Sequence, residues 1–181
     1  MQEIICILDG SGSMSTVADE AMNGFNQFLK DQQAIGEANL TLVWFDTGYD
    51  VAYEGRLSEA QPLTSWRTGS WTALNDAIGK TFAQVKERFT REKPEKVIMA
   101  IQTDGMENAS KEFTLQMVKN LIQEHENKYG WTVIYLGAGL KSASQAQSLG
   151  IGLQNTHVYD PLKTKAAFTN VYSASVTKAR Q

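Results

Sequence analysis

The chain opens with the stretch Ile4-Ile5-Cys6-Ile7-Leu8-Asp9-Gly10-Ser11-Gly12-Ser13, in which five apolar residues run directly into an acidic loop of glycine and serine. An unbroken apolar run of this length is typical of a strand that is buried on both faces of a parallel sheet. The loop after it carries one carboxylate and two hydroxyls on alternate positions. The stretch therefore predicts a central strand over residues 4–8 whose end presents three oxygen-bearing side chains.

Helical and strand-like segments alternate along the rest of the chain. Apolar positions recur at helical spacing in residues 19–33, 72–89 and 113–122, and a short helix at 143–149 and a weak one after Pro161 are also expected. Further strands are expected at residues 40–45, 51–57, 97–101, 131–136 and 157–159. This alternation predicts a doubly wound α/β fold, a mostly parallel sheet with helices on both faces. The turn at residues 46–50 makes 51–57 an antiparallel edge strand.

Size and composition predict one domain over residues 1–181. The apolar share is 42% and the net charge is −3 with both signs interspersed, so no basic surface for nucleic acid and no cationic face for a membrane is expected. No apolar stretch approaches the about 18 residues of a membrane span, and no signal peptide is expected before the first strand. The single cysteine lies inside the first apolar run, which favours a reducing, cytoplasmic setting.

Two of the predicted strands end in acidic loops that contain glycine. Residues 4–8 lead into Asp9-Gly10, and residues 97–101 lead into Thr103-Asp104-Gly105. In doubly wound sheets, ligands bind beyond the carboxyl ends of the strands, where the winding direction reverses. If these two strands are neighbours at that point, their loops face each other across one crevice. Thr72, just before a predicted helix, offers a further hydroxyl.

These side chains suit a hard divalent cation. Mg²⁺ prefers oxygen ligands in near-octahedral geometry, commonly completed by water. The predicted site combines three hydroxyls with two carboxylates, so its formal charge is low and its ion stays electrophilic toward an outside ligand. Mg²⁺ is the expected ion, with Mn²⁺ and Ca²⁺ as alternatives. The predicted metal-site residues are Asp9, Ser11, Ser13, Thr72 and Asp104.

Three motifs follow one another in a specific order. They are Asp9-x-Ser11-x-Ser13, the threonine in Thr68-Gly69-Ser70-Trp71-Thr72-Ala73-Leu74, and Thr103-Asp104-Gly105 after a strand. Together they resemble the metal-ion-dependent adhesion site of von Willebrand factor A domains, and the resemblance spans residues 3–159. The stretches that look closest to bacterial and phage members of that family are residues 104–110 and 135–139.

The resemblance implies a role for each of the five residues. It implies that Ser11 and Ser13 ligate the ion directly, and that Thr72 does so directly or through water. It also implies that Asp9 and Asp104 act mainly through bound water. The sixth position would be open to an Asp or Glu of a partner protein. The implied function is a metal-dependent protein-binding module rather than an enzyme.

Structural interpretations of the same polar residues stay open. Residues 9–13 also fit a polar turn that caps the next helix, and Thr72 fits the N-cap of a helix that begins at Ala73. Glu107 and Asn108 are interpreted as polar residues at the start of a helix rather than as metal ligands. These alternatives require no ion.

The polar stretch over residues 58–71 is expected to form a long surface loop beside the site. It contains Trp66 and Trp71, which would anchor an interface if they are exposed. If the loop lies against the sheet, the same residues are ordinary packing. Trp71 also departs from the family pattern, because small residues commonly precede the threonine there. That departure bears on the geometry of the loop more than on the metal.

The alternative function is a metal-dependent phosphatase or phosphotransferase on a similar sheet, with Asp9 as the nucleophile. That chemistry normally needs a second acid two residues further on, where Ser11 stands, and a positioned base. A Ser-His-Asp hydrolase is disfavoured because the chain has no G-x-S-x-G motif. In addition, neither His125 nor His157 follows a convincing strand, and both are expected to be surface or cap residues.

Overall fold

The computed structural model describes all 181 residues and contains a six-stranded sheet in the order β3-β2-β1-β4-β5-β6. Every neighbouring pair is parallel except β2 and β3, which run antiparallel. The predicted sheet, mostly parallel with one antiparallel edge strand, is confirmed. The strands are β1 (Gln2–Asp9), β2 (Ala38–Phe45), β3 (Tyr49–Arg56), β4 (Lys96–Thr103), β5 (Thr132–Ala138) and β6 (Thr156–Tyr159).

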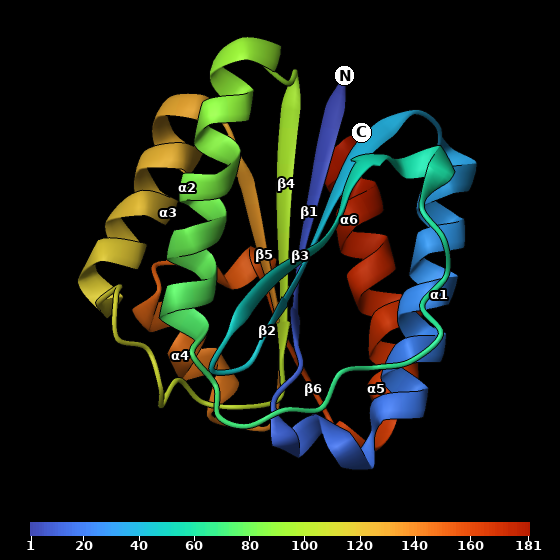
Figure 1. Cartoon of the computed structure of the whole chain (residues 1–181), viewed down its shortest axis with the longest axis vertical. Helices are drawn as coiled ribbons and strands as arrows, with labels where there is room; N and C mark the ends of the chain where they lie inside the picture. The colour runs from blue at the N-terminus through green and yellow to red at the C-terminus, as the bar shows by residue number, and fades with distance from the viewer.

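Helices cover both faces of the sheet (Figure 1). On one face lie α2 (Leu74–Glu92), α3 (Leu115–Tyr129) and the short α4 (Ser142–Ser148). On the other face lie α1 (Ala18–Ile35), α5 (Thr164–Ala166) and α6 (Ser173–Arg180). Short 3-10 turns complete the chain: η1 (Gly12–Thr16), η2 (Leu57–Glu59), η3 (Leu153–Asn155) and η4 (Pro161–Lys163). No helix combines the length and apolarity that crossing a bilayer requires.

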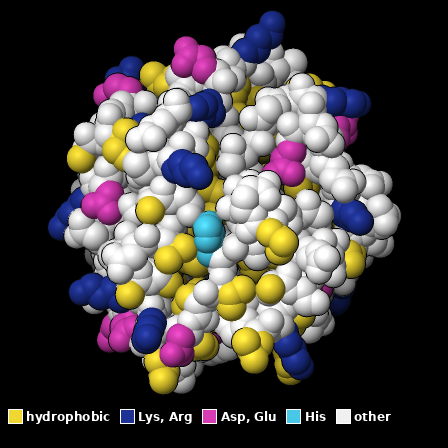
Figure 2. All heavy atoms as spheres, turned by 180° about the vertical axis from the view of Figure 1, so that it is seen from behind, with side chains coloured by type: hydrophobic (Ala, Val, Ile, Leu, Met, Phe, Trp, Pro, Cys, Tyr) yellow, Lys and Arg dark blue, Asp and Glu magenta, His cyan; other side chains and the backbone are white.

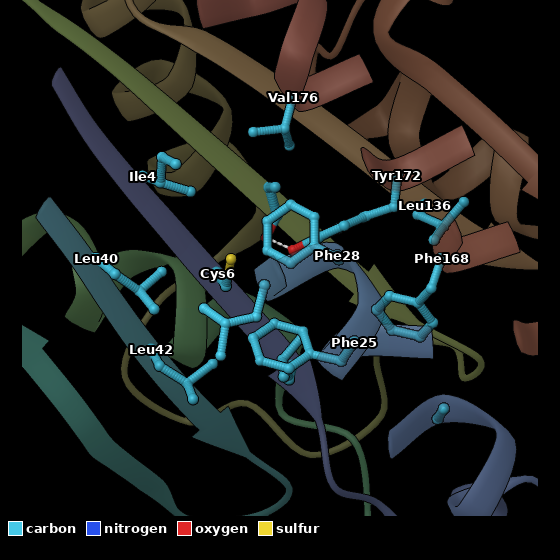
Figure 3. Packing of buried hydrophobic residues seen from close by; sticks show 14 of the residues in the cluster. Ile4, Cys6, Phe25, Phe28, Leu40, Leu42, Leu136, Phe168, Tyr172 and Val176 are labelled. Carbon is cyan, nitrogen blue, oxygen red and sulfur yellow. Dashed lines mark hydrogen bonds between the residues drawn. The ribbon is translucent and has the colours of Figure 1, made fainter. Parts of the chain in front are cut away.

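The first strand supplies side chains to two cores, one on each face. Ile4, Cys6 and Leu8 pack into the cluster beneath α1, whereas Ile5 and Ile7 pack into the cluster beneath α2. Figure 3 shows the first of these clusters, with Ile4 and Cys6 among aromatic side chains from the helices. Because successive strand residues point to opposite faces, only an unbroken apolar run can fill both cores. The cytoplasmic setting inferred from the single cysteine stays a prediction.

The C-terminal helical segment contributes more buried side chains to the core than the weak helical pattern after Pro161 predicts. A π-helix, η5 (Ala167–Tyr172), joins α5 to α6 and makes one helical segment packed on α1. Phe168, Tyr172 and Val176 are fully buried in the core (Figure 3). A Cβ on Gly24 would lie 2.7 Å from the Cβ of Phe168, so the two helices approach closely because residue 24 has no side chain.

The winding direction reverses at β1. This strand pairs in parallel with β2 on one side and with β4 on the other. The strands predicted at 4–8 and 97–101 are therefore neighbours, and the loops that follow them leave the same edge of the sheet. Doubly wound folds bind their ligands at this position, where the two loops meet.

The sheet is open at β6, and apolar side chains are exposed around this edge. Figure 2 shows that, on the face seen from behind, hydrophobic side chains gather near a histidine while charged side chains lie mostly toward the outline. The strand has only four residues, and a short edge strand offers little backbone for pairing with other chains. The strongly exposed apolar residues on or beside it are Leu140, Leu153, Val158 and Leu162.

Candidate metal centre

The two acidic loops are joined by hydrogen bonds. The hydroxyl of Ser13, in the loop after β1, donates to Oδ1 of Asp104, in the loop after β4, at 2.6 Å. The hydroxyl of Thr103 donates to Oδ2 of Asp9 at 2.6 Å, and the backbone N–H of Ser11 donates to Oδ1 of Asp9 at 2.7 Å. The Oγ atoms of Ser11 and Ser13 lie 3.1 Å apart. The structure therefore brings four of the five predicted residues into one continuous cluster of oxygens.

Thr72 reaches the same cluster from the loop before α2. A Cβ on Gly105 would lie 2.8 Å from Oγ1 of Thr72, so this hydroxyl lies against the backbone next to Asp104. Two bonds fix its position: the Thr72 N–H donates to Oδ1 of Asn108 at 2.9 Å, and the Asn108 N–H donates to the Thr72 carbonyl at 3.0 Å. All five predicted residues thus meet at the carboxyl ends of β1 and β4.

The long loop before α2 is held against the loop that carries the two serines. The N–H of Gly12 donates to the carbonyl of Ser70 at 3.0 Å, and the N–H of Gly69 donates to the carbonyl of Gly10. A Cβ on Gly12 would lie 3.1 Å from the carbonyl oxygen of Gly69. The backbones approach this closely because glycine occupies these positions. The hydroxyl of Thr72 is placed by these contacts rather than by any local helical pattern.

The site carries two carboxylates without a basic partner. Asp9 is fully buried and Asp104 is half-buried, and neither forms an ion pair with a lysine or arginine. Burial raises the pKa of Asp9. Burial, followed by repulsion from Asp9, raises the pKa of Asp104 to about 6. A cation in the crevice would relieve both effects, because it replaces the lost hydration and offsets the repulsion.

The donor set fits a hard cation that is bound mainly by hydroxyls. No group of three or more His, Cys, Asp or Glu side chains surrounds the crevice, so a thiolate or imidazole site is absent. Adjacent ligands of an octahedral Mg²⁺, each about 2.1 Å from the ion, lie roughly 3 Å apart. The 3.1 Å separation of the Ser11 and Ser13 hydroxyl oxygens matches that spacing. The side chains present are therefore compatible with Mg²⁺.

No known family model and no curated protein matches the chain, but solved structures do. The vWF domain of the type V pili tip protein Mfa5 from Porphyromonas gingivalis is similar with a TM-score of 0.71 and 12% sequence identity. The match covers 99% of this chain and 96% of that one. The chain has a von Willebrand factor A fold.

Two other structures share this von Willebrand factor A fold. A von Willebrand factor type A protein from Catenulispora acidiphila matches with a TM-score of 0.64 and 16% identity, over 96% of this chain and 42% of that one. The ArnB paralog VWA2 from Sulfolobus acidocaldarius matches with a TM-score of 0.61 and 18% identity, over 93% and 44%. The chain spans less than half the length of these two proteins. The predicted closeness to bacterial and phage members stays a prediction.

The helix-capping interpretations of the site residues are wrong. In this structure Ser11 is the N-cap of η1 and Ala73 is the N-cap of α2, and neither residue makes a side-chain capping bond. Helix α2 begins at Leu74, so Thr72 lies outside it. The Ser11 hydroxyl instead lies 3.1 Å from that of Ser13, and the Thr72 hydroxyl lies against the backbone of Gly105. The ligand role of the five residues stays a prediction.

Glu107 and Asn108 do not start the next helix, which begins at Leu115 behind the N-cap Thr114. Glu107 instead caps α2 from across the crevice: its Oε2 accepts from the N–H of Asn75 at 2.8 Å. In the opposite direction, the carboxylate of Asp76 in α2 accepts hydrogen bonds from the backbone N–H groups of residues 111–113, which follow Glu107 in the chain. These bonds lower the pKa of Asp76 against the opposing effect of burial. The sequence offers no local signal for this reciprocal pair.

The two tryptophans of the long loop have opposite environments. Trp66 is 7% exposed, packs edge-on against Trp44, and donates from Nε1 to the carbonyl of Asp9 at 2.9 Å. Trp71 is 67% exposed. Trp66 therefore supports the loop after β1 from beneath, whereas Trp71 is exposed to solvent. Because its side chain lies outside the fold, Trp71 is accommodated before Thr72 without displacing the threonine.

Proposed function

We propose that this chain binds one divalent cation, Mg²⁺ in the first instance, in the crevice between β1 and β4, and that the bound ion accepts a carboxylate from a partner protein. The observation that carries the proposal is the meeting of three hydroxyls and two unneutralised carboxylates at the switch point of the sheet. The fold supports it in a general way, since Mfa5, which shares the fold, is a pilus tip protein. Mn²⁺ and Ca²⁺ are alternative ions.

The proposed ligands divide into hydroxyls and carboxylates with different tasks. Ser11, Ser13 and Thr72 would contact the ion through their hydroxyl oxygens. Asp9 orients the loop, since both its oxygens already accept hydrogen bonds, and Asp104 would hold bound water. When bound, the ion supplies a positive centre with one position open to an Asp or Glu of the partner. Because its direct ligands would be neutral hydroxyls, the ion would keep most of its positive charge and attract that carboxylate strongly.

Apolar side chains next to the crevice favour a protein partner over a small ion-pairing ligand. Trp71 directly precedes Thr72, and Met106, two residues after Asp104, is 43% exposed. Exposed tryptophan and methionine are enriched at the centres of protein interfaces. We infer that the partner places an acidic side chain on the ion and an apolar side chain against Trp71.

The phosphatase alternative conflicts with the position of Asp9. Its carboxylate is fully buried, and its two oxygens accept from the Ser11 N–H and the Thr103 hydroxyl. A nucleophile must reach the substrate phosphorus, and this one is enclosed. We therefore expect no Mg²⁺-dependent hydrolysis of p-nitrophenyl phosphate above contaminant controls. Turnover that disappears in Asp9→Asn would contradict this expectation.

Removal of the metal should leave the fold intact. The two cores lie on the faces of the sheet and consist of apolar side chains, none of which is a proposed ligand of the ion. We expect the near-ultraviolet circular dichroism to be unchanged by chelator. Mg²⁺ at 100 times its dissociation constant should still raise the free energy of unfolding by about 2.7 kcal/mol through binding to the folded state alone. Collapse of the near-ultraviolet signal with chelator would show that the ion is structural.

Mg²⁺ affinity should fall as the pH falls through about 6. The raised pKa of Asp104 means that its proton must leave before the ion binds, so below this pH the affinity should drop by roughly tenfold per pH unit. In the metal-free protein, the Asp104 contribution to stability is present at low pH and is lost as the pH rises through about 6. Calorimetry and thermal unfolding from pH 5 to pH 8 should show these opposite trends, with Asp104→Asn reducing both.

The functional test is capture of a partner with and without the metal. Immobilised protein should retain the partner in Mg²⁺ and release it with chelator. Thr72→Ala, and neutralisation of one acidic residue of the partner, should each weaken binding without unfolding either protein. These losses should not add, because each breaks the same linkage. A partner whose affinity is equal in Mg²⁺ and in chelator would show that the crevice is not its binding surface.

A further inference from the structure

A second hollow lies between α2 and α3, at the opposite end of the sheet from the metal centre. It has a volume of about 610 Å³, within the range of small-molecule sites. Its floor includes Val97 at the start of β4 and Trp131 just before β5. Figure 1 shows the two helices side by side on this face. None of the five proposed metal-site residues lines this hollow.

Aromatic side chains line one wall of the hollow. The rings of Phe82 and Trp131 are stacked, with centroids 5.3 Å apart and planes 20° apart. His125 lies 4.4 Å from the Phe82 ring and 4.5 Å from the Trp131 ring. Phe89 meets Trp131 edge-on, and Tyr129 is 62% exposed at the margin. Phe82 is buried beneath the other two rings, so the half-buried Trp131 is the ring that offers a flat apolar surface to a planar aromatic ligand.

His125 adds one polar group to this wall. Its Nδ1 lies 2.7 Å from the carbonyl oxygen of Leu121, so Nδ1 carries the proton and Nε2 is left as an acceptor. Burial lowers the pKa of His125, which favours this neutral form at pH 7. No protein group bonds to Nε2. A ligand with an N–H or O–H group next to its ring would meet an acceptor there.

The charges around the hollow are unbalanced. Lys86, Lys93 and Lys96 line it and form no ion pair. The two acids on the same rim are already engaged, Glu95 with the N-terminal amine at 3.4 Å and Glu124 with Lys128 at 3.1 Å. The free charge at the rim is therefore positive and complements an anion.

Lys93 also has an unusual backbone. It is the only non-glycine residue with positive φ, at 44°, and it forms the left-handed C-cap of α2. Glycine or asparagine is the common choice at such a cap, because other side chains are strained in the left-handed conformation. The lysine at this position lines the hollow and adds its charge there.

We propose that the α2–α3 hollow binds a small planar aromatic anion, with its ring against the half-buried Trp131 and its acidic group toward Lys93 and Lys96. The aromatic wall, the free acceptor of His125 and the three unpaired lysines all fit this class of ligand. Binding at this hollow is independent of the metal centre and should persist in chelator.

A fluorescent pair of probes tests the proposal. 1-Anilinonaphthalene-8-sulfonate carries a sulfonate, and N-phenyl-1-naphthylamine has the same rings without charge. Folded protein in chelator should bind the sulfonate with one-to-one saturation and at least about fivefold more tightly than the neutral probe, equivalent to about 1 kcal/mol from the rim charges. Lys93→Gln with Lys96→Gln should remove that preference and leave the neutral probe unaffected. Lys119→Gln, outside the hollow, should change nothing.

A second variant blocks the hollow without touching the core. Ala83 is exposed and lines the hollow, and Gln84, next to it on α2, is exposed but does not. Ala83→Glu adds bulk and negative charge inside the hollow and should weaken binding of the sulfonate probe by about tenfold or more. Gln84→Glu adds the same charge outside the hollow and should have little effect on that binding. Absence of saturable binding in the wild type, or equal effects of the two glutamates, would overturn the proposal.

Discussion

Replacing Ser11 and Ser13 together by alanine should abolish Mg²⁺ binding, with a loss of at least about 100-fold in affinity. Both hydroxyls are proposed direct ligands, and their oxygens already lie 3.1 Å apart, at the spacing of adjacent ligands. With both removed, the crevice retains one threonine hydroxyl and two carboxylates, too few ligands to replace the hydration of an ion that dehydrates reluctantly. Isothermal calorimetry of the wild type and the double variant measures the loss directly.

The matched control is Ser15→Ala, which removes an exposed serine hydroxyl from the same 3-10 turn. No hydrogen bond links Ser15 to the oxygen cluster, so its loss should leave the affinity within a factor of two. The near-ultraviolet circular dichroism of all variants should match the wild type, because neither Ser11 nor Ser13 belongs to a core. Mg²⁺ binding that is unchanged in the double variant would refute the assignment of the site.

Trp66→Ala should be the most destabilising single substitution near the site, with a cost of about 3–5 kcal/mol in the free energy of unfolding. Trp66 is buried against Trp44 and Phe168, with ring centroids 4.7 and 5.7 Å away. Its Nε1–H also satisfies the carbonyl of Asp9, which ends β1. Removal creates a cavity and leaves a buried acceptor without a partner. Urea denaturation at constant pH measures the change.

Trp71→Ala is the natural comparison, because it deletes the same side chain five residues away from an exposed position. It should change the free energy of unfolding by no more than about 0.5 kcal/mol. It should nevertheless lower the affinity for the proposed partner protein. Trp66→Phe should recover most of the packing but not the hydrogen bond to Asp9. Equal destabilisation by Trp66→Ala and Trp71→Ala would contradict the opposite environments of the two residues.

The fold was predictable because its signals are local or periodic. The run at residues 4–8 fills two cores at once, so every one of its residues is apolar. A half-buried strand would instead show alternating apolar and polar residues. Helices α1 and α2 each bury one row of apolar side chains, and this row appears in the sequence as apolar residues at helical spacing. The C-terminal segment was underestimated because polar residues alternate with its apolar ones, and because the π-helix over Ala167–Tyr172 interrupts the regular α-helical geometry that the periodicity assumes.

The composition of the site was predictable, but its supports were not. Five oxygen-bearing residues followed from motif order, and the structure places them together. The bond from Trp66 to Asp9 and the exchange between Glu107 and the start of α2 join residues more than 30 positions apart. Such contacts depend on the folded geometry and have no periodic signature. For the same reason, the sequence left the exposure of Trp66 and Trp71 open.

The most direct test of the central claim is the relaxation of water protons around Mn²⁺, which would stand in for Mg²⁺. Mn²⁺ bound at the crevice should enhance relaxation with one-to-one saturation, because coordinated water exchanges at its open positions. Acetate or glutarate should then reduce the enhancement by displacing one of these waters, and Ser11→Ala with Ser13→Ala should show neither effect. Absence of Mn²⁺ binding at millimolar concentrations, or bound Mn²⁺ whose enhancement carboxylates leave unchanged, would contradict the proposed mechanism.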